Sequence, residues 1–298
     1  MATKRKKLST SRVKLVTQLD KALEREVAKL QREFEREVME FMTKELDVKD
    51  GKIVNSTRNQ AKLFKMEAKA QEFSDRHSKR VARQMAAGMG KIIVANEAYF
   101  LNQAKVPKQL RNKLRRDLLA SYGYKKVKGK FTIVAGSWLA NLAKTDRVFD
   151  TVQEIGINAV ARGVPLDSFR KQVTKAAFGS GLGSISHHFR TKAKDTYAQF
   201  DRSAHVQYAE ELSFRAFIYE GGTIDTTRDF CERNNGKVFL ISEAESLWPS
   251  QEWSGKNESY EAMRDMGGHN CRHHPSFISD ALAIQLRPEL KDILGKAA

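Results

Sequence analysis

Apolar residues between Ser11 and Leu46 recur at helical spacing. They are Val16, Leu19, Leu23, Val27, Leu30, Phe34, Val38 and Phe41. Steps of three and four residues average close to the 3.5–3.6 residues of a helix seam. Glu, Arg and Lys fill the positions between them, and neither Gly nor Pro interrupts the run. The pattern predicts one long amphipathic helix whose apolar stripe packs against a partner helix or a second copy of the chain.

Less regular apolar patterns follow the turn that we expect at Asp50-Gly51. A second helix is predicted from Ser56 to Ala87, and Gly88-Met89-Gly90 indicates that it ends or bends there. Further helices are predicted at 91–104, 109–122, 138–144, 147–161, 168–178 and, as one long helix, 185–219. A short β-like patch at 131–134 interrupts this helical pattern.

A glycine-rich run at 179–184 predicts a flexible joint, because glycines at this density do not hold regular structure cheaply. After it the chain changes to shorter elements with more Gly and Asn and both cysteines. We therefore expect a mainly α protein with a small α+β C-terminal domain. Its parts are a long amphipathic helix over 1–50, a basic helical arm or body over 51–180 and a compact Cys/His-containing domain over 181–298.

Positive charge is concentrated in one part of the chain, whose formal net charge is +17. Residues 51–130 contain 20 Lys and Arg against 5 Asp and Glu, whereas 1–50 and 131–298 are close to neutral. Like charge at this density repels itself unless an anionic partner offsets it, and nucleic acid is the commonest such partner. The cations expected to contact phosphates are Arg76, Lys79, Arg80, Arg83, Arg111, Lys113, Arg115, Arg116, Lys125, Lys126, Lys128 and Lys130. Few aromatics or amides lie among them, so the contact would be blind to base sequence. The alternative is a solvated basic helical surface without a nucleic-acid partner.

Several protein classes are disfavoured by the same sequence. No run approaches the roughly 18 apolar residues of a membrane span, and no apolar segment follows the basic N-terminus as in a secretory signal. We expect a soluble protein made in a cytoplasm. Two cysteines, Cys231 and Cys271, are too few for a disulfide framework, which leaves free thiols or a metal site.

Two patches distinguish the C-terminal region. The first is Thr227-Arg228-Asp229-Phe230-Cys231, followed by an Asn235-Gly236 turn into a strand, Lys237-Val238-Phe239. The second is Gly267-Gly268-His269-Asn270-Cys271-Arg272-His273-His274-Pro275. Between them, Trp248 and Trp253 supply bulky anchors for a small core.

This ordered combination resembles the Mu F-like minor head protein domain of tailed phages, over about the last 100 residues. Residues 1–180 are compatible only through their helical, basic character. Where many members have His-Pro-x-Cys-Arg-Cys in the second patch, this chain has Asn270 before Cys271 and His273 in place of the last cysteine. A second cysteine near Cys231 is also absent.

The same residues contain the donors of a zinc site. Cys231, His269, Cys271 and either His273 or His274 are two thiols and two imidazoles, a set that can fill a tetrahedral site. Residues two apart on a strand lie about 6–7 Å from each other, so the segment would have to bend. The alternative is that the two cysteines lie close together in the small core as buried thiols, or as a disulfide formed once particles leave the cell. The imidazoles and Arg272 would then hydrogen-bond to local groups.

The resemblance implies a structural protein of the virion rather than an enzyme. It implies a minor head protein inside the phage head, associated with the portal and capsid interior and present in multiple copies. It is also compatible with ejection of the protein together with the genome. The charge pattern adds a contact to the backbone of packaged double-stranded DNA. One alternative is a nucleic-acid-modifying or ADP-ribosylating enzyme that uses the Cys/His patch, with Asp225, Asp229 and Glu232 as candidate acids. Another is a scaffold or coiled-coil adaptor without a DNA role.

Overall fold

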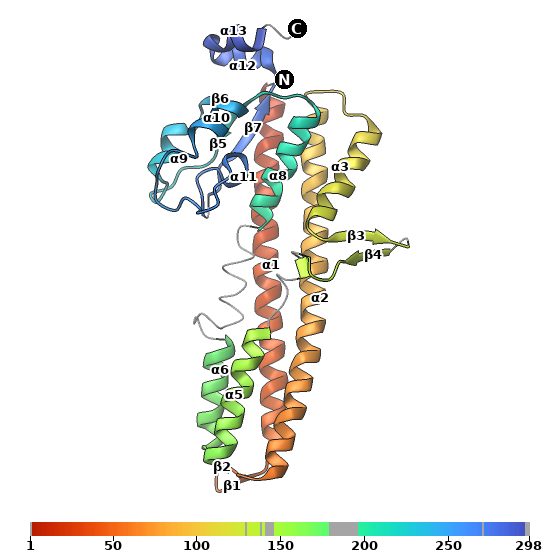
Figure 1. Ribbon diagram of the computed structural model, residues 1–298, viewed down its shortest axis with the longest axis vertical. Coiled ribbons are helices and arrows are strands. Elements are labelled where there is room, and N and C mark those ends of the chain that lie inside the picture. The colour runs from red at the N-terminus through yellow and green to blue at the C-terminus, as the bar shows by residue number, and fades with distance from the viewer. Residues whose placement is uncertain are drawn as a thin grey trace. The chain divides into compact units, whose positions relative to one another are not determined.

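The chain forms two compact units. The computed structural model describes residues 2–128, 130–137, 139–140, 146–178, 196–269 and 271–295 (Figure 1). Unit 1 combines residues 1–19, 88–121 and 195–298, and unit 2 combines 20–87 and 122–194. Both units are therefore discontinuous in sequence, unlike the expected contiguous parts 1–50, 51–180 and 181–298.

Two long helices explain this difference. The helix α1 (Ala2–Lys44) has 43 residues and α2 (Thr57–Leu101) has 45. At 1.5 Å per residue each is about 65 Å long, roughly twice the diameter of a small domain. One compact unit cannot cover such a helix, so α1 and α2 each contribute residues to both units.

The predicted amphipathic helix is confirmed by α1. Its apolar stripe is buried at Val16, Leu23, Val27, Leu30, Phe34, Val38 and Phe41. The partner is α2, since the rings of Phe34 and Phe73 lie 5.0 Å apart between centroids. The strands β1 (Val48–Lys49) and β2 (Lys52–Ile53) form a tight hairpin between the two helices.

The helix end predicted at Gly88-Met89-Gly90 is wrong, because α2 continues through these residues. A Cβ atom on Gly88 would lie 2.5 Å from the Tyr197 hydroxyl on α8 (Thr196–Glu211). Gly88 therefore permits a close approach between two helices and does not end one.

Unit 2 also contains a hairpin and a helix pair. The strands β3 (Tyr124–Val127) and β4 (Lys130–Ile133) are antiparallel, which extends the β-like patch that the sequence predicts. The helices α5 (Asp146–Arg162) and α6 (Leu166–Phe178) lie at the predicted places. The predicted glycine joint lies outside the described residues, as does most of the predicted helix at 138–144.

Unit 1 is built around a three-stranded antiparallel sheet of order β6-β5-β7. These strands are β5 (Ala216–Glu220), β6 (Val238–Leu240) and β7 (His274–Ile278). The remaining elements of the unit are α3 (Lys108–Ser121), α9 (Asp229–Asn234), α10 (Ile241–Leu247), α11 (Ala262–Asp265), α12 (Asp280–Leu286), the 3-10 turn Pro288–Leu290 and α13 (Lys291–Leu294). A mainly α chain with a small α+β C-terminal domain is thus confirmed.

The predicted long helix over 185–219 is wrong over its last residues, 212–219, and its first residues, 185–195, lie outside the described residues. The helix α8 ends at Glu211, and Ala216–Glu220 form the central strand of the sheet. Ala216, Phe217, Ile218 and Tyr219 are all buried, because the strand is covered on both faces. From sequence alone, a short continuous apolar run of this kind is equally consistent with a buried strand and with a buried helix.

An aromatic core fixes the sheet to the Cys-containing segments. Trp248 is 2% exposed and meets the rings of Phe217, Tyr219, Phe230 and Phe239 at edge-on angles. Such packing places α9, and with it Cys231, against the sheet. As for membranes, no helix within the described ranges combines the length and apolarity that a bilayer span requires.

Candidate metal centre and basic surface

Cys231, Cys271 and His273 form one buried group in unit 1. Their ligand atoms all lie within 4.8 Å of one another. The two Sγ atoms are 3.9 Å apart, and Cys271 Sγ lies 3.8 Å from His273 Nδ1. Cys231 comes from α9, whereas Cys271 and His273 lie in the segment between α11 and β7. The expectation that both cysteines lie close together and are buried is confirmed.

A turn at Gly267-Gly268 brings Cys271 into this group. Gly268 has a φ of +90°, and its carbonyl accepts a hydrogen bond from the Cys271 amide. The amide of Gly267 donates to Cys271 Sγ at 3.3 Å. A Cβ on Gly267 would lie closer than 3.0 Å to Cys231 Sγ, so the backbone passes directly beside both sulfurs.

The same turn separates the four residues predicted as zinc ligands. Three of them converge, but the side chain of His269 is exposed and lies outside the group. The bend that the sequence argument required therefore exists, and it directs His269 away. His274, the alternative ligand, instead places Nε2 2.9 Å from Ser9 Oγ on α1.

The surroundings make the two thiols inequivalent. The Tyr219 hydroxyl donates to Cys231 Sγ at 3.3 Å, and burial raises the pKa of Tyr219. The hydrogen bond with Cys271 and burial raise the pKa of Cys231. The pKa of Cys271 is lowered because Cys231, His273 and the Arg202 charge all favour its thiolate. One thiolate in this pair therefore forms at Cys271, and a thiolate is the form that binds metal.

The group fits zinc in donor type and spacing. With Zn–S bonds of about 2.3 Å and Zn–N bonds of about 2.0–2.1 Å, a tetrahedral site has S···S edges of about 3.8 Å and S···N edges of about 3.6 Å. The observed 3.9 and 3.8 Å match these edges closely. Two thiols and one imidazole supply three of the four ligands of a tetrahedral site.

Sequence reasoning missed a residue that holds the ligand segment in place. Arg202 on α8 is 3% exposed, and its Nη1 donates to the carbonyls of Cys271 at 3.1 Å and His273 at 3.4 Å. Its Nε donates to the carbonyl of Arg264. An arginine on a predicted helix gives no sign that it is buried, whereas the double glycine of the second patch could have indicated the tight approach to the sulfurs.

The predicted phosphate-binding cations divide into two sets. The cations of the first set form ion pairs: Arg76 with Glu37, Arg80 with Glu26 and Glu33, Arg111 with Glu97, Lys113 with Glu211 and Arg116 with Asp117. Lys79, Arg83, Arg115, Lys125 and Lys128 are exposed and have no ion pair among the described residues. The side chains of Lys126 and Lys130 lie outside the described set. The basic stretch is thus partly neutralised by acidic residues of its own chain.

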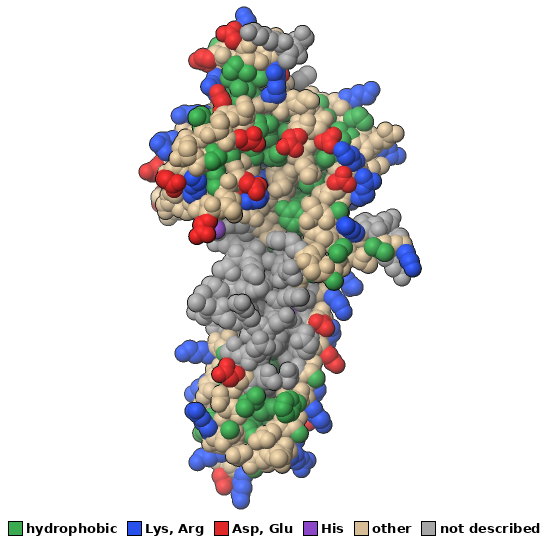
Figure 2. Space-filling view, viewed as in Figure 1, with side chains coloured by type: hydrophobic (Ala, Val, Ile, Leu, Met, Phe, Trp, Pro, Cys, Tyr) green, Lys and Arg blue, Asp and Glu red, His purple; other side chains and the backbone are tan. Residues whose placement is uncertain are grey.

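The face of unit 1 seen in Figure 2 carries mixed charge. Asp and Glu side chains lie among Lys and Arg side chains over it, and hydrophobic side chains occur singly between them.

Comparison of the chain with models of protein families, with curated proteins and with solved structures finds no match.

Proposed function

We propose that this chain is a structural protein of a tailed-phage virion, a minor head protein of the Mu F-like type. The observation that supports this most is the convergence of the residues that carry the resemblance. Phe230-Cys231 and Cys271-Arg272-His273 lie far apart in sequence, and their Cys and His side chains meet in one buried group. The motif therefore acts as the internal framework of a small domain, which is what a docking module inside the head requires.

Burial favours this structural role over the enzyme alternative. Cys231, Cys271 and His273 are only 2%, 4% and 3% exposed. A nucleophile or a general base must reach its substrate within hydrogen-bond distance. Side chains this deeply buried are better suited to holding segments together.

We further propose that Cys231, Cys271 and His273 bind structural zinc. Zinc would join α9 to the segment that enters β7, and structural zinc contributes directly to folding free energy. The distances from Cys271 Sγ to Cys231 Sγ and to His273 Nδ1, which match the edges of a tetrahedral zinc site, support this role.

The proposed contact with packaged DNA is carried by the exposed cations for which the described residues supply no acidic partner. Lys79 and Arg83 lie one helical turn apart on α2, so both can meet phosphates on one side of the helix. Lys and Arg contacts to phosphate fix position without reading base sequence. The proposed location is the virion interior, near the portal.

Purified particles of the phage or prophage that encodes the chain provide the test. Quantitative mass spectrometry should find the intact chain at few copies per particle. Protease should leave it uncut in filled heads and cleave it after the DNA is released. Particles that lack the chain, with normal amounts of major capsid and portal protein, would overturn the proposal.

A further inference from the structure

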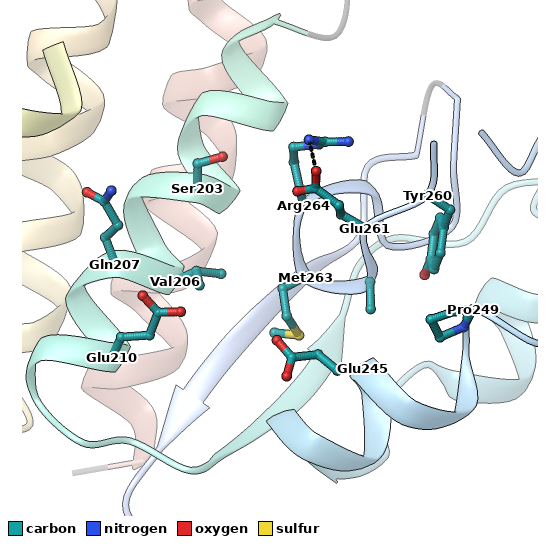
Figure 3. Close-up of a pocket in the computed structure, with 11 residues that line it drawn as sticks. Ser203, Val206, Gln207, Glu210, Glu245, Pro249, Tyr260, Glu261, Met263 and Arg264 are labelled. Atoms are coloured by element: carbon teal, nitrogen blue, oxygen red, sulfur yellow. Dashed lines mark ion pairs between the residues drawn. The ribbon is translucent and has the colours of Figure 1, made fainter. Parts of the chain in front are cut away.

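A pocket of about 490 Å³ opens on unit 1, lined by α8, α10, α11 and the segment that leads into α11 (Figure 3). Its apolar floor contains Val206, Met263 and Pro249. Two carboxylates stand at its rim, Glu210 from α8 and Glu245 from α10. Figure 3 shows both reaching toward the same space beside Met263.

These two carboxylates have no positive partner within the described part of the chain. Among the described residues neither Glu210 nor Glu245 forms an ion pair, whereas Glu261 at the same pocket pairs with Arg264 at 2.5 Å. Partial burial and the neighbouring charges of Glu245 and Glu211 raise the pKa of Glu210. Two carboxylates that repel each other in a partly enclosed space are stabilised by a cation placed between them.

The two carboxylates stand beside apolar side chains of the pocket. Acceptors above an apolar floor match the chemistry of a lysine side chain, which carries three N–H donors on a four-carbon apolar stem. The pocket thus selects a basic segment that also has an apolar side chain.

The chain itself contains such a segment in the β3–β4 hairpin. Lys125, Val127 and Lys128 are exposed there, and Val127 is 50% exposed despite being apolar. Lys125 and Val127 are two apart on β3, so they project from the same face of the hairpin. One face of the hairpin therefore presents a cation beside an apolar side chain. This combination complements the carboxylates and the apolar side chains of the pocket.

We propose that the pocket on unit 1 receives the β3–β4 hairpin of a second copy of this chain. Lys125 and Lys128 meet Glu210 and Glu245, and Val127 covers the apolar floor. The contact is heterologous, because it joins two different surfaces, and repetition builds a ring when the rotation closes. One hairpin buries less than about 1,000 Å² of surface, so each contact is weak alone. Closure of the ring strengthens the association. This inference goes beyond the proposed function, because it concerns the purified protein and holds with or without a virion.

Charge reversal on either surface tests the proposal with the full chain. Variant one carries Glu210→Lys and Glu245→Lys, and variant two carries Lys125→Glu and Lys128→Glu. Sedimentation velocity at 5–200 µM protein in low salt, roughly 50 mM, should show association of the wild type. Each variant alone should associate at least tenfold more weakly. An equimolar mixture should recover association, because the hairpin of variant one meets the unchanged pocket of variant two.

The control variant carries Glu232→Lys and Glu258→Lys, two exposed carboxylates of unit 1 outside the pocket. It has the same net charge as variant one and should associate like the wild type. Thermal melting of all the variants checks that they are folded. A monomeric wild type throughout the concentration range would overturn the proposal, and so would a mixture of the two variants that stays dissociated. Equal weakening by the control would also overturn it, because net charge would then be the cause. Absence of the chain from particles would leave these results unchanged, so the two proposals fail separately.

Discussion

Arg12 Nη1 donates to Asp201 Oδ2 at 2.7 Å, and the two side chains are 0% and 5% exposed. The other carboxylate oxygen of Asp201 accepts from Asn96 Nδ2 at 2.9 Å, and Asn96 Oδ1 lies 2.5 Å from His205 Nδ1. Three helices, α1, α2 and α8, therefore meet at a single buried carboxylate. This is why the first 19 residues belong to unit 1 with the C-terminal domain.

Replacement of Arg12 by Met should destabilise unit 1 by about 3–5 kcal/mol, since it leaves the Asp201 charge buried without its partner. Urea denaturation measures the free energy of unfolding. Lys14→Met is the matched control, because Lys14 is exposed on the same helix and should cost well under 1 kcal/mol. The double variant Arg12→Met/Asp201→Leu should recover part of the loss, since it removes the unpaired charge as well. Equal effects of Arg12→Met and Lys14→Met would show that the ion pair contributes little.

The approach of Gly267 to the two sulfurs leads to a second prediction. An alanine methyl there would overlap Cys231 Sγ, so Gly267→Ala should cost about 1–3 kcal/mol as the sulfurs are pushed apart. Gly222→Ala is the control, because a Cβ on that exposed glycine would meet nothing within 4 Å. Thermal melting of the two variants compares them. A melting temperature of Gly267→Ala equal to that of the wild type would argue against the tight packing of this turn.

Zinc binding is tested with variants of Cys231, Cys271 and His273, whose side chains converge, and of His269, whose side chain lies outside the group. Protein prepared with zinc should hold about one ion per chain, and Cys231→Ala, Cys271→Ala and His273→Ala should each reduce that content severely. His269→Ala should leave it unchanged, because His269 is exposed and outside the group. Elemental analysis gives the metal content, and melting with and without a chelator gives its contribution to stability. If the wild type takes up no zinc, the site is a pair of buried thiols, and the zinc proposal fails.

The sequence predicts the helices of this fold well where one periodic stripe dominates. The α1 stripe needs only the spacing of its apolar residues, and α3, α5 and α6 follow from similar local patterns. Prediction from the sequence fails where a tertiary contact decides the secondary structure. Gly88 lies inside a helix because Tyr197 needs the space, and Ala216–Glu220 are a strand because partners 20 or more positions away pair with them.

The candidate site shows the same division. The residue types of a zinc centre are visible in the sequence, and so is the need for a bend. Which ligand the bend would exclude depends on the positive φ of Gly268, which the sequence alone does not reveal. The ion pairs that occupy Arg76 and Arg80 depend on the register between α1 and α2, and a count of charges contains no information about it.

A pH dependence of stability follows from His77 on α2. Its side chain is 2% exposed, and burial together with the nearby Arg80 lowers the pKa of His77 to about 4. An unfolded histidine has a pKa of about 6.5, so below that pH the unfolded state takes up a proton that the folded state does not. Stability is therefore fully present above pH 6.5 and is lost as the pH falls toward 4. Between pH 7 and 5 the loss should be about 2 kcal/mol from this residue.

His77→Phe should reduce that loss, because the variant has no imidazole to protonate in either state. Urea denaturation of the wild type and the variant at pH 7, 6 and 5 gives the difference in slope. An NMR titration of His77 checks the assignment directly. A titration midpoint near 6.5 in the folded protein would contradict the prediction.

Salt-dependent DNA binding separates two sets of exposed cations: those without an acidic partner among the described residues and those already in ion pairs. Lys79→Gln/Arg83→Gln removes two charges without ion pairs, and Arg76→Gln/Arg80→Gln removes two that pair with Glu26, Glu33 and Glu37. Both variants lose the same net charge from the same helix. Each phosphate contact contributes about 0.9 to the slope of log affinity against log salt, so loss of the first pair should reduce the slope by nearly 2. Loss of the second pair should reduce the slope less, because those cations already have anionic neighbours.

The measurement is fluorescence anisotropy with two unrelated duplexes over a range of salt, and both duplexes should give the same slope. Equal reductions by the two variants would show that the glutamates of α1 do not limit DNA contact, and a slope near zero for the wild type would remove the DNA contact from the proposed function.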